Sequence, residues 1–178
     1  MRRFFTGPLF FFSIAACVGQ AEPGAQAGAK SSPKATPTAP VSNEGVERPV
    51  APKPTFVVAP PGDAAQVVQS TVASAPDPQR VLVYVGAGWC EPCTRFHKAV
   101  EAGTLDDKLA GVVFVEFDAD NDRARLAAAG YDGKLIPRFV RPSDDGSASQ
   151  KRIEGGVKGD RAVENIMGRL TPLLPSGA

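Results

Sequence analysis

The sequence predicts an α/β domain in which a central mixed sheet is flanked by helices. Two apolar, β-favouring runs, Val81–Val85 and Val112–Phe117, are typical of buried strands, and segments with helical spacing alternate with them. A third such run precedes the turn residues 143–146 and a further short strand, which together indicate a hairpin. Alternating strands and helices, followed by a hairpin and a last helix, are the pattern of this fold class.

The individual elements follow from apolar spacing and from residues that start or stop them. Helices are expected at Asp63–Ala75, Thr94–Glu101, Asn121–Ala129 and Asp160–Leu174, and the strands of the hairpin at Ile136–Val140 and Gln150–Ile153. Asp63 is a suitable N-cap for the first helix, and Gly130 is a suitable stop for the third. The basic residues of the hairpin are expected to form its exposed, charged face; they are Arg138, Arg141, Lys151 and Arg152.

The N-terminal third of the chain is predicted to lie outside this domain. Nine of the 17 prolines fall between Pro23 and Pro61, a stretch with a single aromatic residue, Phe56. Such a composition cannot bury enough apolar surface to offset the entropy lost on folding. We therefore expect residues 17–61 to be a Pro- and Ala-rich disordered tether and residues 62–178 to form the folded domain.

The first 16 residues are predicted to be a signal peptide. A short basic start is followed by the uncharged, mostly apolar residues 4–16, a run too short for the ~20 residues of a membrane-spanning helix. The run ends in the letters IAAC, which resemble the signal of bacterial lipoproteins. This resemblance implies cleavage before Cys17 and lipidation of that cysteine; an ordinary secretory signal is the alternative. Val18 instead of aspartate favours the outer membrane, on the periplasmic side of the bacterial envelope, over the inner membrane.

Net charge and cysteine count exclude several classes of protein. The 178 residues contain 20 Lys and Arg against 19 Asp and Glu, a net charge of +1, which argues against a nucleic-acid binder. Three cysteines, two close together and one isolated, are too few for a scaffold held by disulfides. After removal of residues 1–16 no polybasic patch remains, so attachment to a membrane would depend on the lipid.

The chemistry of the chain is expected at residues 89–93, WCEPC. A C-x-x-C pair that follows a buried strand and opens a helix is a redox signature. Cys90 and Cys93 can close a disulfide across the first helical turn, and the helix N-terminus favours the thiolate of the first cysteine. The second cysteine can then resolve a mixed disulfide. Pro92 suits the first turn, where its missing N–H costs little.

These residues resemble the thioredoxin family. WCEPC is similar to the family's WCGPC, Ile136-Pro137 matches the loop with its cis-proline, and Gly155-Gly156 falls near its late glycine turn. The resemblance covers Asp63–Leu174 and implies a thioredoxin-like fold. It also implies a thiol–disulfide oxidoreductase without a cofactor. The expected partners are protein disulfides or thiols, together with an upstream membrane or envelope thiol reductant.

The resemblance also assigns roles to individual residues. Cys90 takes the attacking role and Cys93 the resolving role. Trp89 flanks the thiol and shapes the surface that meets the partner. Pro137 presents its backbone to an extended client segment, keeps metals off the dithiol, and is expected to follow a cis peptide bond.

Three positions depart from the family. Tyr84 stands where the family holds a buried aspartate as proton acceptor, and tyrosine is a poor base at neutral pH. Glu116 stands where the family has a lysine, so the carboxylate has moved to the neighbouring strand; a proton relay and a solvent-facing strand end both remain open. Glu91 replaces glycine, and its charge is expected to raise the pKa of Cys90 and make the dithiol more reducing.

The motif has three other interpretations. Cys90, Cys93 and His97 offer three metal ligands where a structural zinc site takes four, so no metal is expected. A structural disulfide that takes no part in exchange is a second alternative, although the small ring that a C-x-x-C disulfide closes is a poor structural cross-link. A third alternative is a tethered binding module that uses the fold to hold peptides without redox turnover, against which the intact cysteines argue.

Overall fold

The described part of the chain in this computed structural model is residues 51–175. The predicted signal peptide, the predicted lipidation site Cys17 and most of the predicted tether lie outside these residues. Within residues 51–175, no helix combines the length and apolar character needed to cross a bilayer.

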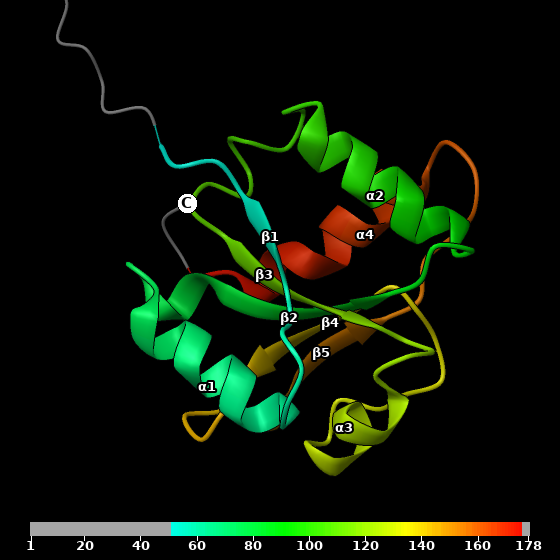
Figure 1. Ribbon diagram of the computed structural model, residues 1–178. Helices are drawn as coiled ribbons and strands as arrows, with labels where there is room; N and C mark the ends of the chain where they lie inside the picture. The colour runs from blue at the N-terminus through cyan, green and yellow to red at the C-terminus, as the bar shows by residue number, and fades with distance from the viewer. Residues whose placement is uncertain (1–50, 176–178) are drawn as a thin grey trace, which may run out of the picture. The chain divides into compact units, whose positions relative to one another are not determined.

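A five-stranded mixed sheet organises the described residues (Figure 1). The strand order is β1-β3-β2-β4-β5, with β1 and β2 parallel to β3, and with β4 antiparallel to both β2 and β5. The strands are β1 Thr55–Val58, β2 Val81–Gly86, β3 Val113–Asp118, β4 Arg138–Pro142 and β5 Ala148–Glu154. The predicted α/β fold class, with a central mixed sheet flanked by helices, is confirmed.

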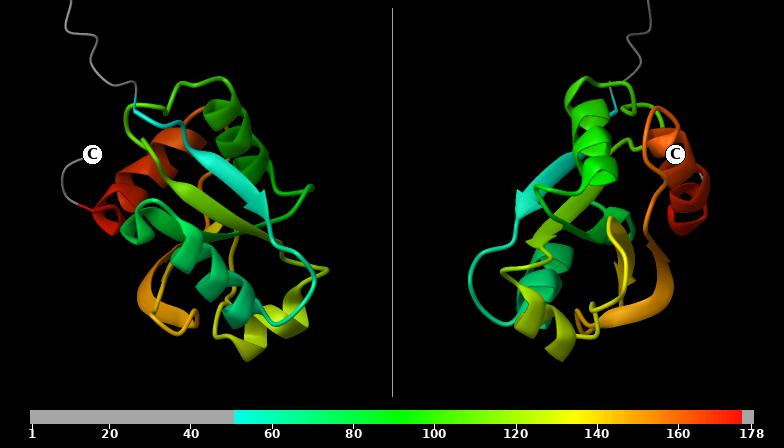
Figure 2. Two further views of the ribbon diagram at one scale, coloured as in Figure 1. Left: turned by 60° about the vertical axis from the view of Figure 1, so that its left-hand side comes forward. Right: turned by 90° about the vertical axis from the view of Figure 1, so that its right-hand side faces the viewer.

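Helices cover both faces of the sheet. The α-helices are α1 Ala64–Ser74, α2 Glu91–Glu101, α3 Arg123–Ala128 and α4 Ala162–Leu170, and the short 3-10 turns are Pro78–Arg80 and Thr171–Leu173. Helices α2 and α4 lie on one face, and α1 and α3 lie on the other (Figures 1 and 2). The sheet therefore separates two apolar cores, and β2, at its centre, is buried along its whole length.

The predicted start and stop residues do what their chemistry predicts. Asp63 accepts a hydrogen bond from the backbone N–H of Gln66 at 2.9 Å and caps α1. Gly130 follows α3 with a φ of +76°, a left-handed conformation that glycine adopts without strain. The last helix ends earlier than predicted, at Leu170, and continues as a 3-10 turn.

The fold begins before the predicted boundary at residue 61. Strand β1 lies inside the predicted tether and pairs with β3, with Phe56 opposite Phe114. The Phe56 ring stacks on the rings of Phe114 at 5.0 Å and His97 at 3.9 Å between centroids. The prediction was wrong here because Pro-rich composition hid one short strand, whose single aromatic side chain completes the core beneath α2.

Candidate active site

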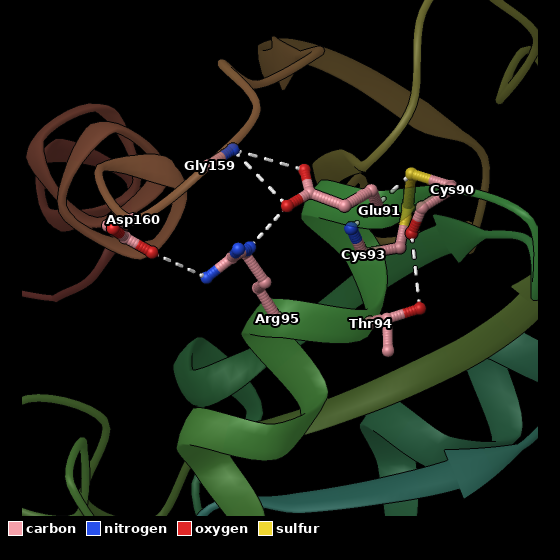
Figure 3. Close-up of polar contacts among 7 residues, drawn as sticks. All are labelled: Cys90, Glu91, Cys93, Thr94, Arg95, Gly159 and Asp160. Atoms are coloured by element: carbon pink, nitrogen blue, oxygen red, sulfur yellow. Dashed lines mark hydrogen bonds and ion pairs between the residues drawn. A yellow bond between two sulfur atoms is a disulfide. The ribbon is translucent and has the colours of Figure 1, made fainter.

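Cys90 and Cys93 form a disulfide across the start of α2 (Figure 3). Their Cα atoms are 5.2 Å apart. Cys90 is the N-cap of the helix, and its sulfur accepts a hydrogen bond from the backbone N–H of Cys93 at 3.3 Å. After reduction the same N–H and the positive end of the helix dipole favour a thiolate at Cys90.

Burial hardly distinguishes the two cysteines, but their positions do. Cys90 is 4% exposed and Cys93 is 2% exposed, so both cysteines are buried in the disulfide form. Cys90 occupies the cap, with its backbone N–H donated to the carbonyl of Ala87 at 3.1 Å. Cys93 instead lines a cavity beneath the helix. The two sulfurs therefore meet different surroundings once the disulfide opens.

Trp89 stands out from the surface next to Cys90. It is 71% exposed, and its indole Nε1–H donates a hydrogen bond to the carboxylate of Asp120 at 2.7 Å. Asp118 in turn accepts the backbone N–H groups of Asp120 and Asn121, which fixes the turn that carries Asp120. This hydrogen bond orients the exposed indole, which is next to Cys90 in the chain.

Two loops complete the surroundings of the disulfide. The Ile136–Pro137 peptide bond is cis, as predicted, and the carbonyl of Pro137 accepts the backbone N–H of Gly155 at 2.9 Å. A Cβ at Gly156 would lie 3.2 Å from the ring of Pro92, so this loop packs directly on the C-x-x-C turn. The predicted proline and glycine loops are therefore neighbours of the motif in space.

Exposed apolar side chains occur on all three of these segments. Trp89, Leu135 and Val157 are exposed, and the side chain of Leu135 lies against Gly155, within about 3.1 Å of a Cβ placed there. Exposed apolar side chains on the segments around a reactive pair can hold an extended apolar segment of another chain.

Glu91 contacts a loop that is far from it in the sequence (Figure 3). Its carboxylate forms an ion pair with Arg95, one turn along α2, and accepts the backbone N–H of Gly159 at 3.2 and 3.3 Å. Arg95 also contacts the carboxylate of Asp160 at 3.1 Å. The hydrogen bond from Arg95, and then that from Gly159, hold the pKa of Glu91 below its usual range. Glu91 is therefore not the free charge that the sequence suggested.

Glu116 points into the cavity beneath α2. This cavity has a volume of about 440 Å³ and is lined by Cys93, Tyr84, Glu116 and His97, among others. The carboxylate of Glu116 lies 2.9 Å from Nε2 of His97, and both side chains are partly buried. Glu116 therefore lies on the side of the sheet that carries Cys93. Its side chain is not directed only to solvent from the end of β3.

The sequence did not predict the contact that His97 makes with Glu116 in this cavity. Its position four residues after Cys93 places both on one helical face, which was the available signal. Its partner in the structure is the Glu116 carboxylate, and within residues 51–175 no three His, Cys, Asp or Glu side chains group as a metal site.

Arg138, which follows the cis-proline, is buried and does not join the exposed face predicted for the hairpin. It is 4% exposed, and its guanidinium donates to the carbonyls of Tyr131 at 2.6 Å and Leu135 at 3.1 Å. Its Nε lies 3.6 Å from the carboxylate of Glu154, which is opposite it across β4 and β5. Glu154 also accepts the backbone N–H groups of Lys134 and Leu135. The pair braces the loop that leads to Pro137.

No family model matches this chain, and no curated protein sequence does. Among solved structures it is similar to the thioredoxin of Fasciola hepatica, with 22% identity over 63% of this chain and 96% of that chain, at a TM-score of 0.40. A mutant thioredoxin from Halobacterium salinarum NRC-1 gives 22% identity, 69% and 95% coverage, and a TM-score of 0.41. Trichomonas vaginalis thioredoxin gives 20% identity, 58% and 84% coverage, and a TM-score of 0.36. At these identities and TM-scores the similarity assigns no function to this chain.

Proposed function

We propose that this chain is a thiol–disulfide oxidoreductase that reduces or isomerises protein disulfides through Cys90 and Cys93. The observation that carries the proposal is the pairing of a helix N-cap sulfur with a second sulfur one turn later. A sulfur at a helix N-terminus is stabilised as the thiolate, which is the nucleophile in disulfide exchange. A second cysteine within reach limits the lifetime of the mixed disulfide.

In the reducing direction, the Cys90 thiolate attacks one sulfur of the client disulfide. This step forms a mixed disulfide and releases the other client sulfur as a thiolate. Cys93 then loses its proton and attacks the sulfur of Cys90, which releases the second client thiolate and closes the Cys90–Cys93 disulfide. Two electrons pass to the client, and its thiolates take up the two protons that the dithiol gave up. A dithiol of an envelope reductant resets the pair by the reverse exchange.

Glu116 and His97 are suited to receive the proton of Cys93. Both line the cavity that Cys93 lines, and the 2.9 Å contact between them spreads an added proton over a carboxylate and an imidazole. In the thioredoxin family this proton goes to a buried aspartate at the position that Tyr84 occupies on β2. Here the corresponding carboxylate would be that of Glu116 on β3. Glu116 is thus the proposed proton acceptor of the resolving step.

The client is held by the apolar surface around the disulfide. Trp89, Leu135 and Val157 provide exposed apolar contacts. The loop at Pro137, which the hydrogen bond to Gly155 holds in place, presents its backbone to the client segment. This arrangement fits an extended polypeptide segment with an apolar residue near its disulfide.

The protein is proposed to act in the bacterial envelope, attached through lipid on Cys17 to the periplasmic side of the outer membrane in preference to the inner membrane. The support is the sequence IAAC at the end of the apolar run. Cys17→Ser should release the protein from the membrane fraction or leave the uncleaved precursor. Wild-type fractionation and migration of this variant would contradict the lipid anchor.

Reduction of insulin by the purified protein, with dithiothreitol as the reductant, tests the proposed activity. Cys90→Ser should abolish the accelerated reduction, and Cys93→Ser should accumulate a mixed disulfide with insulin, visible by mass spectrometry. Cys17→Ser is the matched control, because it removes a cysteine outside the motif and should keep full activity. A wild-type protein that binds extended peptides but accelerates reduction no more than Cys90→Ser would instead be a binding module.

A further inference from the structure

The hydroxyl of Tyr84 is a buried polar group without a hydrogen-bond partner among the described residues. Tyr84 is 1% exposed, and its ring packs among the aromatic rings of Phe56, Phe96 and Phe139. A buried hydroxyl that makes no hydrogen bond destabilises a fold, and among residues 51–175 of the disulfide form this hydroxyl has no partner.

The hydroxyl lies at the end of the sheet that carries the dithiol. A Cβ at Gly86 would be 2.5 Å from the Tyr84 oxygen, so the oxygen sits against the last residue of β2, four residues before Cys90. Tyr84 and Cys93 line the same cavity beneath α2. Gly86, against which the hydroxyl sits, lines this cavity as well, so the hydroxyl lies beside the cavity that Cys93 lines.

The charged side chains that line this cavity come from α2, from β3 and from the turn before α3. Glu116 on β3 and His97 on α2 form the pair described above, and Asp118 and Asp122 also line the cavity. Strands β1 and β4 bring the aromatic rings of Phe56 and Phe139 to the tyrosine. Burial, and then the nearby Glu116 carboxylate, raise the pKa of Tyr84 above its usual value. The hydroxyl thus keeps its proton and can act as a donor but not as a base.

We propose that the Tyr84 hydroxyl donates a hydrogen bond to the sulfur of Cys93 when the disulfide is reduced. The inference rests on the proposed redox function of the pair. Reduction adds two electrons and two protons and breaks the S–S bond, which leaves Cys93 as a thiol or thiolate. A thiolate accepts a hydrogen bond more strongly than a neutral disulfide sulfur, because charge-assisted hydrogen bonds are the stronger ones. The hydroxyl thereby stabilises the reduced state more than the oxidised state.

Glutathione equilibration of wild type and Tyr84→Phe tests the inference, because the substitution removes one oxygen and keeps the ring. Each turnover consumes two glutathione molecules and yields one glutathione disulfide and the protein dithiol. The equilibrium constant for this reduction should fall about threefold to tenfold in Tyr84→Phe. In a Cys90→Ser background, the same substitution should raise the pKa of the Cys93 thiol by about half a unit to one unit.

Tyr131→Phe is the matched control. Tyr131 is also buried, but it lies in the core on the opposite face of the sheet, and its hydroxyl donates to the carbonyl of Gly146 at 2.7 Å. The control should leave the equilibrium constant unchanged. An unchanged constant in Tyr84→Phe, or an equal fall in both variants, would overturn the inference. A wild-type pair that does not equilibrate with glutathione at all would instead overturn the proposed redox function.

Discussion

The carboxylate of Glu91 accepts the backbone N–H of Gly159 at 3.2 and 3.3 Å, although 68 residues separate them (Figure 3). The contact joins the C-x-x-C turn to the loop that enters α4. Because the same carboxylate pairs with Arg95, the anion that follows Cys90 in the chain has a cation directly against it. The influence of Glu91 on the Cys90 thiol is therefore the difference between two opposed charges.

Replacing one partner of this ion pair should shift the pKa of the reduced Cys90 thiol. Glu91→Gln leaves the Arg95 cation unopposed and should lower that pKa by a few tenths to about one unit. Arg95→Gln should raise it by a similar amount. Both side chains are more than one-third exposed, so solvent screening limits the shifts. Since Arg95 and Gly159 hold the pKa of Glu91 low, Glu91 stays ionised throughout a thiol titration.

Thiolate absorbance, followed against pH, measures both shifts. The double variant Glu91→Gln/Arg95→Gln is the control, because it removes both charges and should return the thiol pKa close to the wild-type value. If Glu91→Gln leaves the pKa where it was, the carboxylate acts as a mechanical link to Gly159 and not as an electrostatic one.

The parts of this molecule that were predictable from sequence depend on residues close together in the chain. The Asp63 cap, the buried run of β2 and the C-x-x-C turn each arise within a few residues, where spacing and backbone chemistry decide the structure. The cis bond before Pro137 was expected from the family resemblance, and it is present.

The parts that were missed depend on pairs far apart in the chain. Phe56 joins the core through its register with Phe114, and composition alone does not reveal register. Arg138 is buried because the partner strand brings Glu154 opposite it, whereas basic residues on a hairpin usually face solvent. In each case a tertiary contact overrides what the local sequence favours.

Strand β1 should be an energetic part of the folded domain. Phe56→Ala removes a partly buried ring that stacks on Phe114 and His97, and it should lower the free energy of unfolding by about 2 kcal/mol, less than a fully buried ring would. Val58→Ala on the same strand is the control, because Val58 is 75% exposed and should change stability by less than about 0.5 kcal/mol. Urea unfolding followed by circular dichroism measures both. If Phe56→Ala lowers the free energy of unfolding no more than Val58→Ala does, the Phe56 ring adds nothing to the stability of the fold.

The Arg138–Glu154 pair should position the loop that meets the client. Arg138→Met removes the donors to Tyr131 and Leu135 and leaves a partly buried carboxylate unpaired, so it should lower the free energy of unfolding by about 3 kcal/mol. With a protein disulfide as substrate, the KM should rise more than the kcat falls. The glutathione equilibrium constant of the dithiol should stay unchanged, since the pair does not line the cavity at Cys93.

Gly133→Ala offers a second route to the same disturbance. A Cβ at Gly133 would lie 2.5 Å from both Arg138 Nε and Glu154 Oε1, so the two side chains must move apart. Gly88→Ala is the comparison, because a Cβ there meets nothing within 4 Å. A higher KM in Gly88→Ala, with none in Gly133→Ala, would show that the pair does not govern client binding.

Glu116 should control the rate at which Cys93 resolves the mixed disulfide and should not affect the attack of Cys90 on the client. Glu116→Gln keeps the size of the side chain and a hydrogen-bonding group for His97, but it cannot take the proton of Cys93. The rate at which the mixed disulfide is resolved should fall by about tenfold or more at neutral pH. The attack of Cys90 on the client should keep its rate, so the mixed disulfide should accumulate.

Acid quenching of single-turnover reactions, followed by mass spectrometry, separates these two steps. As the pH rises, Cys93 loses its proton without help, so the difference between Glu116→Gln and wild type should narrow. Glu101→Gln is the matched control, because this carboxylate is exposed at the end of α2 and does not line the cavity. If Glu116→Gln resolves the mixed disulfide at the wild-type rate, the proton of Cys93 leaves by another route. A slowed rate that does not recover at high pH would mean that the substitution disturbs the position of Cys93 and not its ionisation.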